Sequence, residues 1–310
     1  GDRRALAKAI TLIESVRLED RQHSEELLNQ LLPFTGNSLR LGITGVPGVG
    51  KSTFIETFGL QLTSRNLKIA VLAVDPSSPI AGGSILGDKT RMERLARSSQ
   101  VYIRPSPAGR SLGGVGAKTR EALLLCEAAG FDVVIVETVG VGQSEHIVAS
   151  MVDFFLVLML PGGGDELQGI KKGILELADT LIINKADGLS ERLAKTSQGH
   201  YRSALSLLNN TGFWQSEVMT CSALHDKGIS AVWDVICRYR VEANRNGYFQ
   251  SKRSQQNLRW MWQLVDAAWR ARIDENHIVK AAVPQLESAV ADSRMTPLAA
   301  AMELIKLMAN

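Results

Sequence analysis

One nine-residue segment constrains the fold more than any other part of the sequence. It reads Gly45-Val46-Pro47-Gly48-Val49-Gly50-Lys51-Ser52-Thr53 and matches GxxxxGK[ST] at every fixed position. Glycines let successive backbone N–H groups turn inward around a phosphate, and a helix starting there points its positive end at the same group. The segment therefore predicts a phosphate-binding loop (P-loop), with Lys51 bridging the β- and γ-phosphates and the Ser52 hydroxyl ligating Mg²⁺.

Short apolar runs alternate with longer amphipathic stretches from Leu39 to about Arg240, and most runs are near-continuous in Val, Ile and Leu. Such runs are typical of strands buried on both faces. The expected strands are Leu39–Thr44, Lys68–Asp75, Val101–Arg104, Asp132–Glu137, Phe154–Leu160, Thr180–Asn184 and Val218–Cys221. The expected helices are Lys51–Ser64, Ser84–Arg97, Lys118–Ala129, Glu166–Leu177, Leu189–Leu208 and Gly228–Arg238. This order predicts an α/β fold with a doubly wound, mostly parallel sheet that binds ligands at the carboxyl ends of its strands.

The two flanks lack strand patterns. We expect an N-terminal helical extension over residues 1–38, a P-loop NTPase domain over 39–240 and a C-terminal helical segment over 241–310. Thr296 and Pro297 form a good N-cap and first-turn pair for the last helix. Trp260, Trp262 and Trp269 cluster nearby. Two interpretations stay open: a helical subdomain with its own core, or a dimerisation segment, because aromatic side chains are favoured at interfaces.

The identity of the base follows from Asn184-Lys185-Ala186-Asp187, which stands after an expected strand. A carboxylate at Asp187 can accept hydrogen bonds from both N1–H and the exocyclic amine of guanine, a pair of donors that adenine lacks. Because ATP would lose two charged hydrogen bonds, its affinity should be lower than that of GTP by about a hundredfold or more. Further along, the backbone N–H groups of Ser222, Ala223 and Leu224 could donate to the guanine oxygen. The expected ligand is GTP or GDP.

Carboxylates at two other strand ends suit the γ-phosphate side of the site. Asp75 ends the second expected strand and Glu137 the fourth, where Mg²⁺ needs oxygen ligands or water-mediated partners. Asp75 could instead cap a helix. Gly140 can donate its N–H to the γ-phosphate. Asp88 and Arg91 follow a glycine-rich stretch and could supply a Mg²⁺ ligand or a charge stabiliser, or simply form a solvated face.

No glutamine directly follows Gly140, and Gln143 is three residues further on. The group that orients the attacking water therefore stays open, and we predict a low unassisted rate. The stretch Gly113–Thr119 is similar to a second phosphate loop, but Ala117 separates its last glycine from Lys118 and breaks the register. A glycine-rich approach to a helix fits it better. The histidines show no metal-ligand spacing with one another or with cysteine.

Composition limits the partners. With 35 basic and 32 acidic residues the formal charge is only +3, which gives no electrostatic case for nucleic acid or an acidic membrane. The longest strongly apolar run, Phe154–Leu160, is far shorter than the roughly 20 residues of a membrane span. No early stretch has the pattern of a secretion signal, and the three cysteines form no CxxC pair. We therefore expect a cytoplasmic protein without a disulfide framework.

With these motifs in place, the sequence closely resembles the MeaB/ArgK family of P-loop GTPases, the chaperones of adenosylcobalamin-dependent methylmalonyl-CoA mutase. The resemblance covers essentially the whole chain. Beyond the general GTPase motifs it includes three stretches specific to the family: Asp75–Pro79, Gly87–Met92 and Pro161–Gly173.

The resemblance implies slow GTP hydrolysis, a homodimer through the C-terminal helices and a complex with the mutase in which GTP gates cofactor loading and protects the enzyme. It implies that Asp88 and Arg91 lie in a first switch, Glu137–Gln143 in a second, and Asp165–Lys172 in a third that responds to the partner. It also matches Asp75, Asp88 and Glu137 to acidic positions at the Mg²⁺ site. An older association of the family with arginine transport, as an ATP-binding kinase, fits Asp187 poorly.

Two alternatives compete with this interpretation. One is a metal-insertion GTPase of the nickel-delivery type, which commonly carries Cys and His clusters that this sequence lacks. The other is a binding module that holds guanine nucleotide without meaningful turnover.

Overall fold

The computed structural model describes residues 2–15, 17–74, 92–105, 112–138, 140, 144–162, 172–208 and 212–309. A seven-stranded sheet runs through the first part of the chain in the order β3-β2-β4-β1-β5-β6-β7, and every neighbouring pair is parallel. The strands are β1 (Leu39–Gly45), β2 (Ile69–Val74), β3 (Val101–Arg104), β4 (Val133–Thr138), β5 (Phe154–Met159), β6 (Thr180–Ile183) and β7 (Glu217–Thr220). Each expected strand is present with its ends within one residue, which confirms the predicted doubly wound fold.

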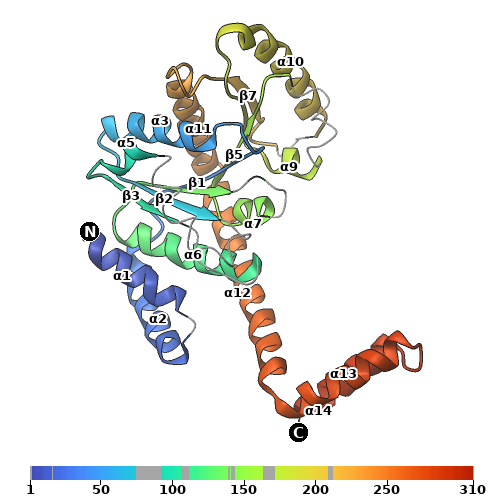
Figure 1. The fold of residues 1–310 in the computed structure, drawn as a ribbon. Helices are drawn as coiled ribbons and strands as arrows, with labels where there is room; N and C mark the ends of the chain where they lie inside the picture. Colours follow the sequence, from blue (N-terminus) through green and yellow to red (C-terminus); the bar gives the residue numbers. More distant parts are fainter. Residues whose placement is uncertain are drawn as a thin grey trace. The chain divides into compact units, whose positions relative to one another are not determined.

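Helices cover both faces of the sheet (Figure 1). On one face α3 (Lys51–Ser64), α5 (Glu93–Ala96) and α11 (Ile229–Arg245) pack on one apolar core. On the other, a second core holds α1 (Arg3–Glu14), α6 (Leu112–Ala128), α7 (Glu145–Ala149), α9 (Lys172–Leu177) and α10 (Glu191–Leu208). The strands lie between the two cores and are buried on both faces, which is why their sequences are continuous apolar runs.

Several helix boundaries differ from the prediction. The helix expected from Lys118 begins at Leu112, so the glycine-rich stretch before it is helical rather than an approach to the helix. Gly116 lets this part of α6 pack closely on α7, because a Cβ there would lie 2.6 Å from Cγ2 of Ile147. The helix expected to end at Arg238 continues to Arg245. Residues 84–91 and 166–171, which begin two other expected helices, lie outside the described residues.

The amino edge of the sheet is held by aspartates that precede strands. Asp132 Oδ2 accepts from the Lys68 amide at 2.7 Å, Asp153 Oδ2 from the Arg40 amide at 2.8 Å, and Asp179 Oδ2 from the Phe155 amide at 2.8 Å. Each carboxylate thus satisfies a backbone N–H within one residue of the start of a neighbouring strand. The repeat of this contact fixes the strand starts relative to one another.

Asp153 also belongs to a buried ionic cluster with Glu127, Arg40 and Arg253. Arg253 donates to Asp153 at 2.6 and 2.7 Å, and Arg40 donates to Glu127 through two bonds of 2.8 Å. Arg253 also donates to the carbonyl oxygens of Gly36 and Ser38. Buried charges require this degree of pairing, because an unpaired one would be strongly destabilising.

The N-terminal helices α1 and α2 (Leu18–Leu31) pack against α6 (Figure 1). Leu6, Ile10 and Ile13 of α1 are buried, as their helical spacing suggests. A short 3₁₀ turn, η1 (Leu32–Phe34), then leads to β1. By its contacts the chain divides into two units, Gly1–Arg253 and Ser254–Asn310, so the N-terminal helices belong with the sheet.

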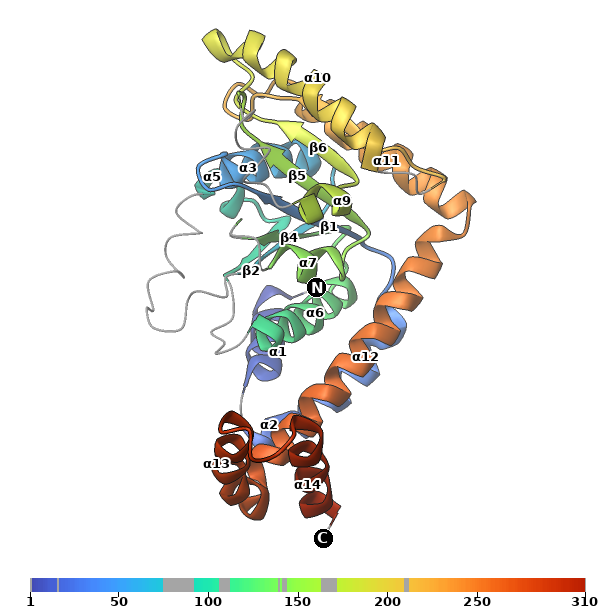
Figure 2. The same ribbon diagram turned by 90° about the vertical axis from the view of Figure 1, so that its right-hand side faces the viewer.

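The second unit comprises most of α12 (Tyr248–Glu275) together with α13 (His277–Ala291) and α14 (Pro297–Ala309), which pack against each other (Figure 2). Thr296 caps α14 as expected, since its Oγ1 accepts from the Ala299 amide at 3.2 Å. Within the described part of this unit, Val279 and Ala300 are the buried apolar residues, whereas nine large ones are exposed. In the part of the chain that the structure describes, no helix has the length and apolarity needed to cross a membrane.

Candidate functional site

The P-loop follows β1 at the carboxyl edge of the sheet, and its backbone depends on glycine. Gly45, Gly48 and Gly50 all have positive φ, and Gly50 caps α3 in the left-handed conformation. A Cβ on Gly45 would lie 2.5 Å from the Leu158 carbonyl oxygen of β5. Val49 is buried beneath the loop, while Pro47, Gly48 and Thr53 are exposed and Val46 is half-buried. The side chain of Val49 thus anchors the loop in the core, while other loop residues remain exposed to solvent.

Lys51 and Gly140 lie side by side at this loop. The Lys51 ammonium donates to the Gly45 carbonyl oxygen at 2.7 Å. A Cβ on Gly140 would lie 1.9 Å from that same oxygen and 2.9 Å from Lys51 Nζ. The backbone at Gly140 therefore packs directly against the start of the P-loop, where the prediction assigns it to the γ-phosphate.

Asn184 joins the P-loop to the two guanine motifs. It is buried, and its Nδ2 donates to the Val49 carbonyl oxygen at 2.9 Å. Its Oδ1 accepts from the Ala223 amide at 3.0 Å. Lys185, at φ 61°, donates from Nζ to the Gly48 carbonyl oxygen at 2.8 Å. Three segments far apart in the sequence therefore form one continuous rim, and no sequence pattern predicted this bridging by Asn184.

Asp187 is held by a hydroxyl whose role no sequence pattern predicted. Ser222 Oγ donates to Asp187 Oδ2 through a short hydrogen bond and accepts from the His225 amide at 3.3 Å. Ser222 was expected to contribute its backbone N–H, but this N–H donates to the Lys227 carbonyl oxygen at 2.9 Å. Ala223 N–H is likewise committed to Asn184, and Leu224 is exposed. The side chain of Ser222 therefore orients the carboxylate. This role becomes visible only in the folded structure, where the Ser222 hydroxyl lies next to Asp187.

Cys221 lies beneath this rim and is chemically quiet. Burial raises the pKa of its thiol to about 12, and the Asp187 carboxylate adds to the effect. The neutral thiol lies 3.4 Å from Asn184 Oδ1, as a weak donor. All three cysteines of the chain are free.

The expected metal residues are only partly described. Ser52 lies half-buried in the first turn of α3. Glu137 is half-buried on β4, in register with Ile43 of β1 and Ala73 of β2. It is the penultimate residue of its strand rather than the last, because the β2 pairing extends to Thr138. Asp75, Asp88 and Arg91 lie outside the described residues. A serine hydroxyl and a glutamate carboxylate are oxygen donors that suit Mg²⁺.

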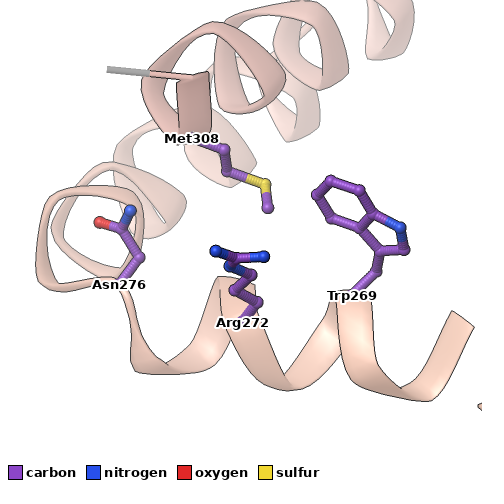
Figure 3. A pocket seen from close by; sticks show the side chains of 4 residues that line it. All are labelled: Trp269, Arg272, Asn276 and Met308. Carbon is purple, nitrogen blue, oxygen red and sulfur yellow. The ribbon is translucent and has the colours of Figure 1, made fainter. Parts of the chain in front are cut away.

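A separate cavity of about 480 Å³ lies in the C-terminal unit, lined by Trp269, Arg272, Asn276 and Met308. Figure 3 shows Trp269 and Arg272 rising from α12 toward Met308. None of the predicted nucleotide residues lines it. Among the described side chains, no three His, Cys, Asp or Glu residues gather in a way that could hold a metal ion.

Comparison with known proteins assigns the family. The family model for methylmalonyl-CoA mutase-associated GTPase MeaB matches residues 6–277. The Escherichia coli GTPase ArgK is 52% identical over 84% of this chain and 79% of its own length. The mouse methylmalonic aciduria type A homolog, a mitochondrial protein, is 43% identical over 99% of this chain and 76% of its own length.

Solved structures agree. The crystal structure of a LAO/AO transport system kinase has a TM-score of 0.80 and 39% identity, covering all of this chain and 94% of that one. HypB from Helicobacter pylori, solved in complex with nickel, matches 72% of this chain with a TM-score of 0.50 and 17% identity, which indicates a shared fold alone. From the family model and from relatives that match nearly its whole length, the chain belongs to the MeaB family of P-loop GTPases.

Proposed function

We propose that this protein hydrolyses GTP with Mg²⁺, and that it does so slowly until a partner engages it. The observation that carries the nucleotide assignment is the rim joined by Asn184, because it links a phosphate loop to an oriented carboxylate. Asp187 then accepts from the two guanine donors while the P-loop amides and Lys51 stabilise the negative charge on the phosphates. Gly140 contributes its amide next to Lys51.

The metal would be held by Ser52 and Glu137, with Asp75 and Asp88 as the further acidic ligands or water-mediated partners. Bound Mg²⁺ would neutralise charge on the β- and γ-phosphates. Arg91 would add positive charge from its side of the site. Hydrolysis is attack of water on the γ-phosphorus with GDP as the leaving group, and the chain's own residues orient the phosphates and shield their charge.

Calorimetry with GTP, GDP and ATP tests the nucleotide assignment. We expect GTP and GDP to bind about a hundredfold more tightly than ATP, because ATP loses the two hydrogen bonds to Asp187. Equal affinity for ATP would contradict the assignment of the base site. Omission of Mg²⁺ should weaken GTP more than GDP, since the γ-phosphate adds charge that the cation shields.

We further propose that the partner is methylmalonyl-CoA mutase, and that the GTP cycle gates adenosylcobalamin loading and protects that enzyme in the cytoplasm. The description of the family and the name of the mouse relative support this choice. Phosphate release should accelerate when purified mutase is added, and the two proteins should co-elute. No stimulation and no co-elution would instead favour a module that only binds guanine nucleotide.

We propose that residues 241–310 mediate a homodimer. The nine exposed apolar side chains of the C-terminal unit support this, because a monomer would leave them in water. Sedimentation should show a dimer for the parent protein and a monomer for Trp262→Glu. Phe34→Glu on η1 is the matched control, since Phe34 lies outside residues 241–310 and is 64% exposed, and Trp262 is 62% exposed. A parent protein that sediments as a monomer, or a Trp262→Glu variant that stays dimeric, would contradict the proposal.

A further inference from the structure

Two threonine hydroxyls and one buried carboxylate meet at the carboxyl ends of β1 and β4. Glu145, the first residue of α7, is 0% exposed, and α7 packs against both strands (Figure 2). Thr44 Oγ1 donates to Glu145 Oε1 at 3.3 Å, and Thr138 Oγ1 donates to Thr44 Oγ1 at 2.6 Å. Thr138 Oγ1 also lies 3.5 Å from Glu145 Oε1. All three residues are buried.

The positions of these residues in the sequence show which segments the contact connects. Thr44 directly precedes Gly45, the first glycine of the P-loop, whereas Thr138 and Glu145 flank residues 139–144. Both ends of that stretch are therefore tied to one hydroxyl beneath the P-loop. The stretch contains Gly140, whose backbone packs against the Gly45 carbonyl oxygen and Lys51.

Stability alone does not account for a carboxylate here. In the part of the chain that the structure describes, Glu145 Oε2 and the neighbouring Ser144 Oγ are buried without a hydrogen-bond partner. A buried polar atom without a partner costs folding free energy, so an apolar side chain of similar size would be less costly at position 145.

The helix that carries Glu145 is itself fixed by close contacts. Ile147 fills the space over Gly116 of α6, where a Cβ would lie 2.6 Å from it. His146 lies against Gly173 of α9, with its Nε2 3.4 Å from where a Cβ would be. Glu145 is thus presented from a rigid support, as a positioning group must be.

We propose that Glu145 is a positioning residue for GTP hydrolysis. With Thr44 and Thr138 it fixes the backbone on both sides of Gly140, at Thr138 and at Glu145, and so holds Gly140 at the γ-phosphate. This rests on the proposed role of Gly140. Because the contact lies beneath the loop and touches none of the residues predicted to bind the base, it acts on the rate of hydrolysis rather than on nucleotide affinity.

The test is single-turnover hydrolysis of prebound GTP, together with the affinities for GTP and GDP. Thr138→Val keeps the shape and removes the hydroxyl, and Glu145→Ala removes the carboxylate. Each should slow hydrolysis roughly ten- to hundredfold, the effect of a small misplacement at a reacting centre, with little change in affinity. Glu145→Gln retains an oxygen acceptor for Thr44 and should recover most of the rate.

Thr180→Val is the matched control. Thr180 is also fully buried, at the opposite edge of the sheet, and its hydroxyl donates to the Glu217 carbonyl oxygen at 3.0 Å. Equal hydrolysis rates in Thr138→Val and Thr180→Val would overturn the proposal, as would a parallel loss of affinity and rate. If Glu145→Ala does not bind GDP, the hydrolysis rates of the two near-isosteric variants, Thr138→Val and Glu145→Gln, test the proposal in its place. A parent protein that binds GTP without hydrolysing it would instead contradict the proposed function itself.

Discussion

At the carboxyl edge of the sheet, Asp187 follows its strand by four residues and is half-buried, with its carboxylate oriented by a serine hydroxyl. At the amino edge, Asp153 stands one residue before its strand and is buried, with its oxygens committed to Arg40 and Arg253. The residue type is the same at both edges. Position relative to the strand decides whether an aspartate is free to take a ligand or is consumed by the fold.

The two edges also differ in the kind of polar groups that they pair. The amino edge pairs charge with charge, and such an arrangement tolerates little change because each partner lost leaves another uncompensated. The carboxyl edge is held by hydrogen bonds from backbone amides, amide side chains and hydroxyls, and Lys51 lies at the P-loop. Variants of the carboxyl edge should therefore alter activity, and variants of the amino edge should alter stability.

The largest effect we expect is at Gly140, on the carboxyl edge. Gly140→Ala would place a Cβ 1.9 Å from the Gly45 carbonyl oxygen, at a φ of 88°. The contacted oxygen belongs to the backbone and cannot move aside as a flexible side chain could. GTP hydrolysis should therefore fall by more than about a thousandfold, or roughly 4 kcal/mol. Gly130→Ala is the control, since its φ is 80° with no atom within 4 Å. If both variants keep full activity, the packing of Gly140 on the P-loop is irrelevant to catalysis.

Asp153→Ala should give the next largest effect, on stability. Removing this carboxylate leaves Arg253 buried with Glu127 3.9 Å away as its remaining acidic neighbour, which should cost about 3–5 kcal/mol of unfolding free energy. Urea unfolding measures this. Asp292→Ala serves as the control, because Asp292 pairs with Arg294 at the surface and should cost about 1 kcal/mol or less. The folded fraction of Asp153→Ala should hydrolyse GTP normally, and a lost activity would erase the contrast between the edges.

Asp187→Asn should change specificity by about a hundredfold without unfolding the protein. The amide can donate to the extra carbonyl of xanthine but cannot accept both guanine donors, so affinity for GTP should fall and affinity for xanthosine triphosphate should rise. Calorimetry measures both. Asp226→Asn, an exposed aspartate beyond Ser222, is the control and should leave both affinities unchanged. An unaltered preference in Asp187→Asn would place the base elsewhere.

The smallest effect concerns pH at the amino edge. Loss of hydration raises the pKa of Asp179, although Lys252 and the Phe155 amide oppose the shift. The folded chain then binds this proton more tightly than the unfolded chain. The carboxyl therefore favours folding at acid pH, and its contribution declines as pH rises from the unfolded pKa to the folded one.

Asp179→Asn removes this titration and keeps an oxygen acceptor for the Phe155 amide. The unfolding free energy of the parent minus that of the variant should decline as pH rises above about 4, the ordinary pKa of an aspartic acid. Urea unfolding at several pH values measures the difference. A difference that does not vary with pH would show that Asp179 titrates alike in both states.

Local sequence patterns predicted the sheet because its strands are buried on both faces, which leaves a signal in every residue of a run such as Phe154–Met159. They predicted the P-loop because GxxxxGK[ST] requires its residues in one order. They did not predict that Asn184 bridges three segments or that Ser222 uses its hydroxyl. Those contacts join residues 35 to 135 positions apart, and spacing along the chain carries no record of such pairs.

The aspartates before the strands could have been noticed, since Asp132, Asp153 and Asp179 each stand at the start of an apolar run. The backbone amides that donate to them could not have been predicted, because each amide lies at the start of a neighbouring strand whose place in the sheet is set by packing. The ionic cluster was missed for the same reason. Arg40 lies inside a predicted strand, where nothing in the alternation of residues indicates a charge buried against α6.

Arg253 has a consequence for how the chain is made. It contacts Gly36 and Ser38, more than 200 residues earlier in the sequence, and it is the last residue of the first unit. While the protein is being synthesised, Asp153 emerges from the ribosome about a hundred residues before the guanidinium of Arg253 that neutralises it. The amino edge of the sheet therefore closes only after the start of α12 has been translated, and ribosome-bound chains that stop short of that point hold a sheet with an unneutralised buried charge.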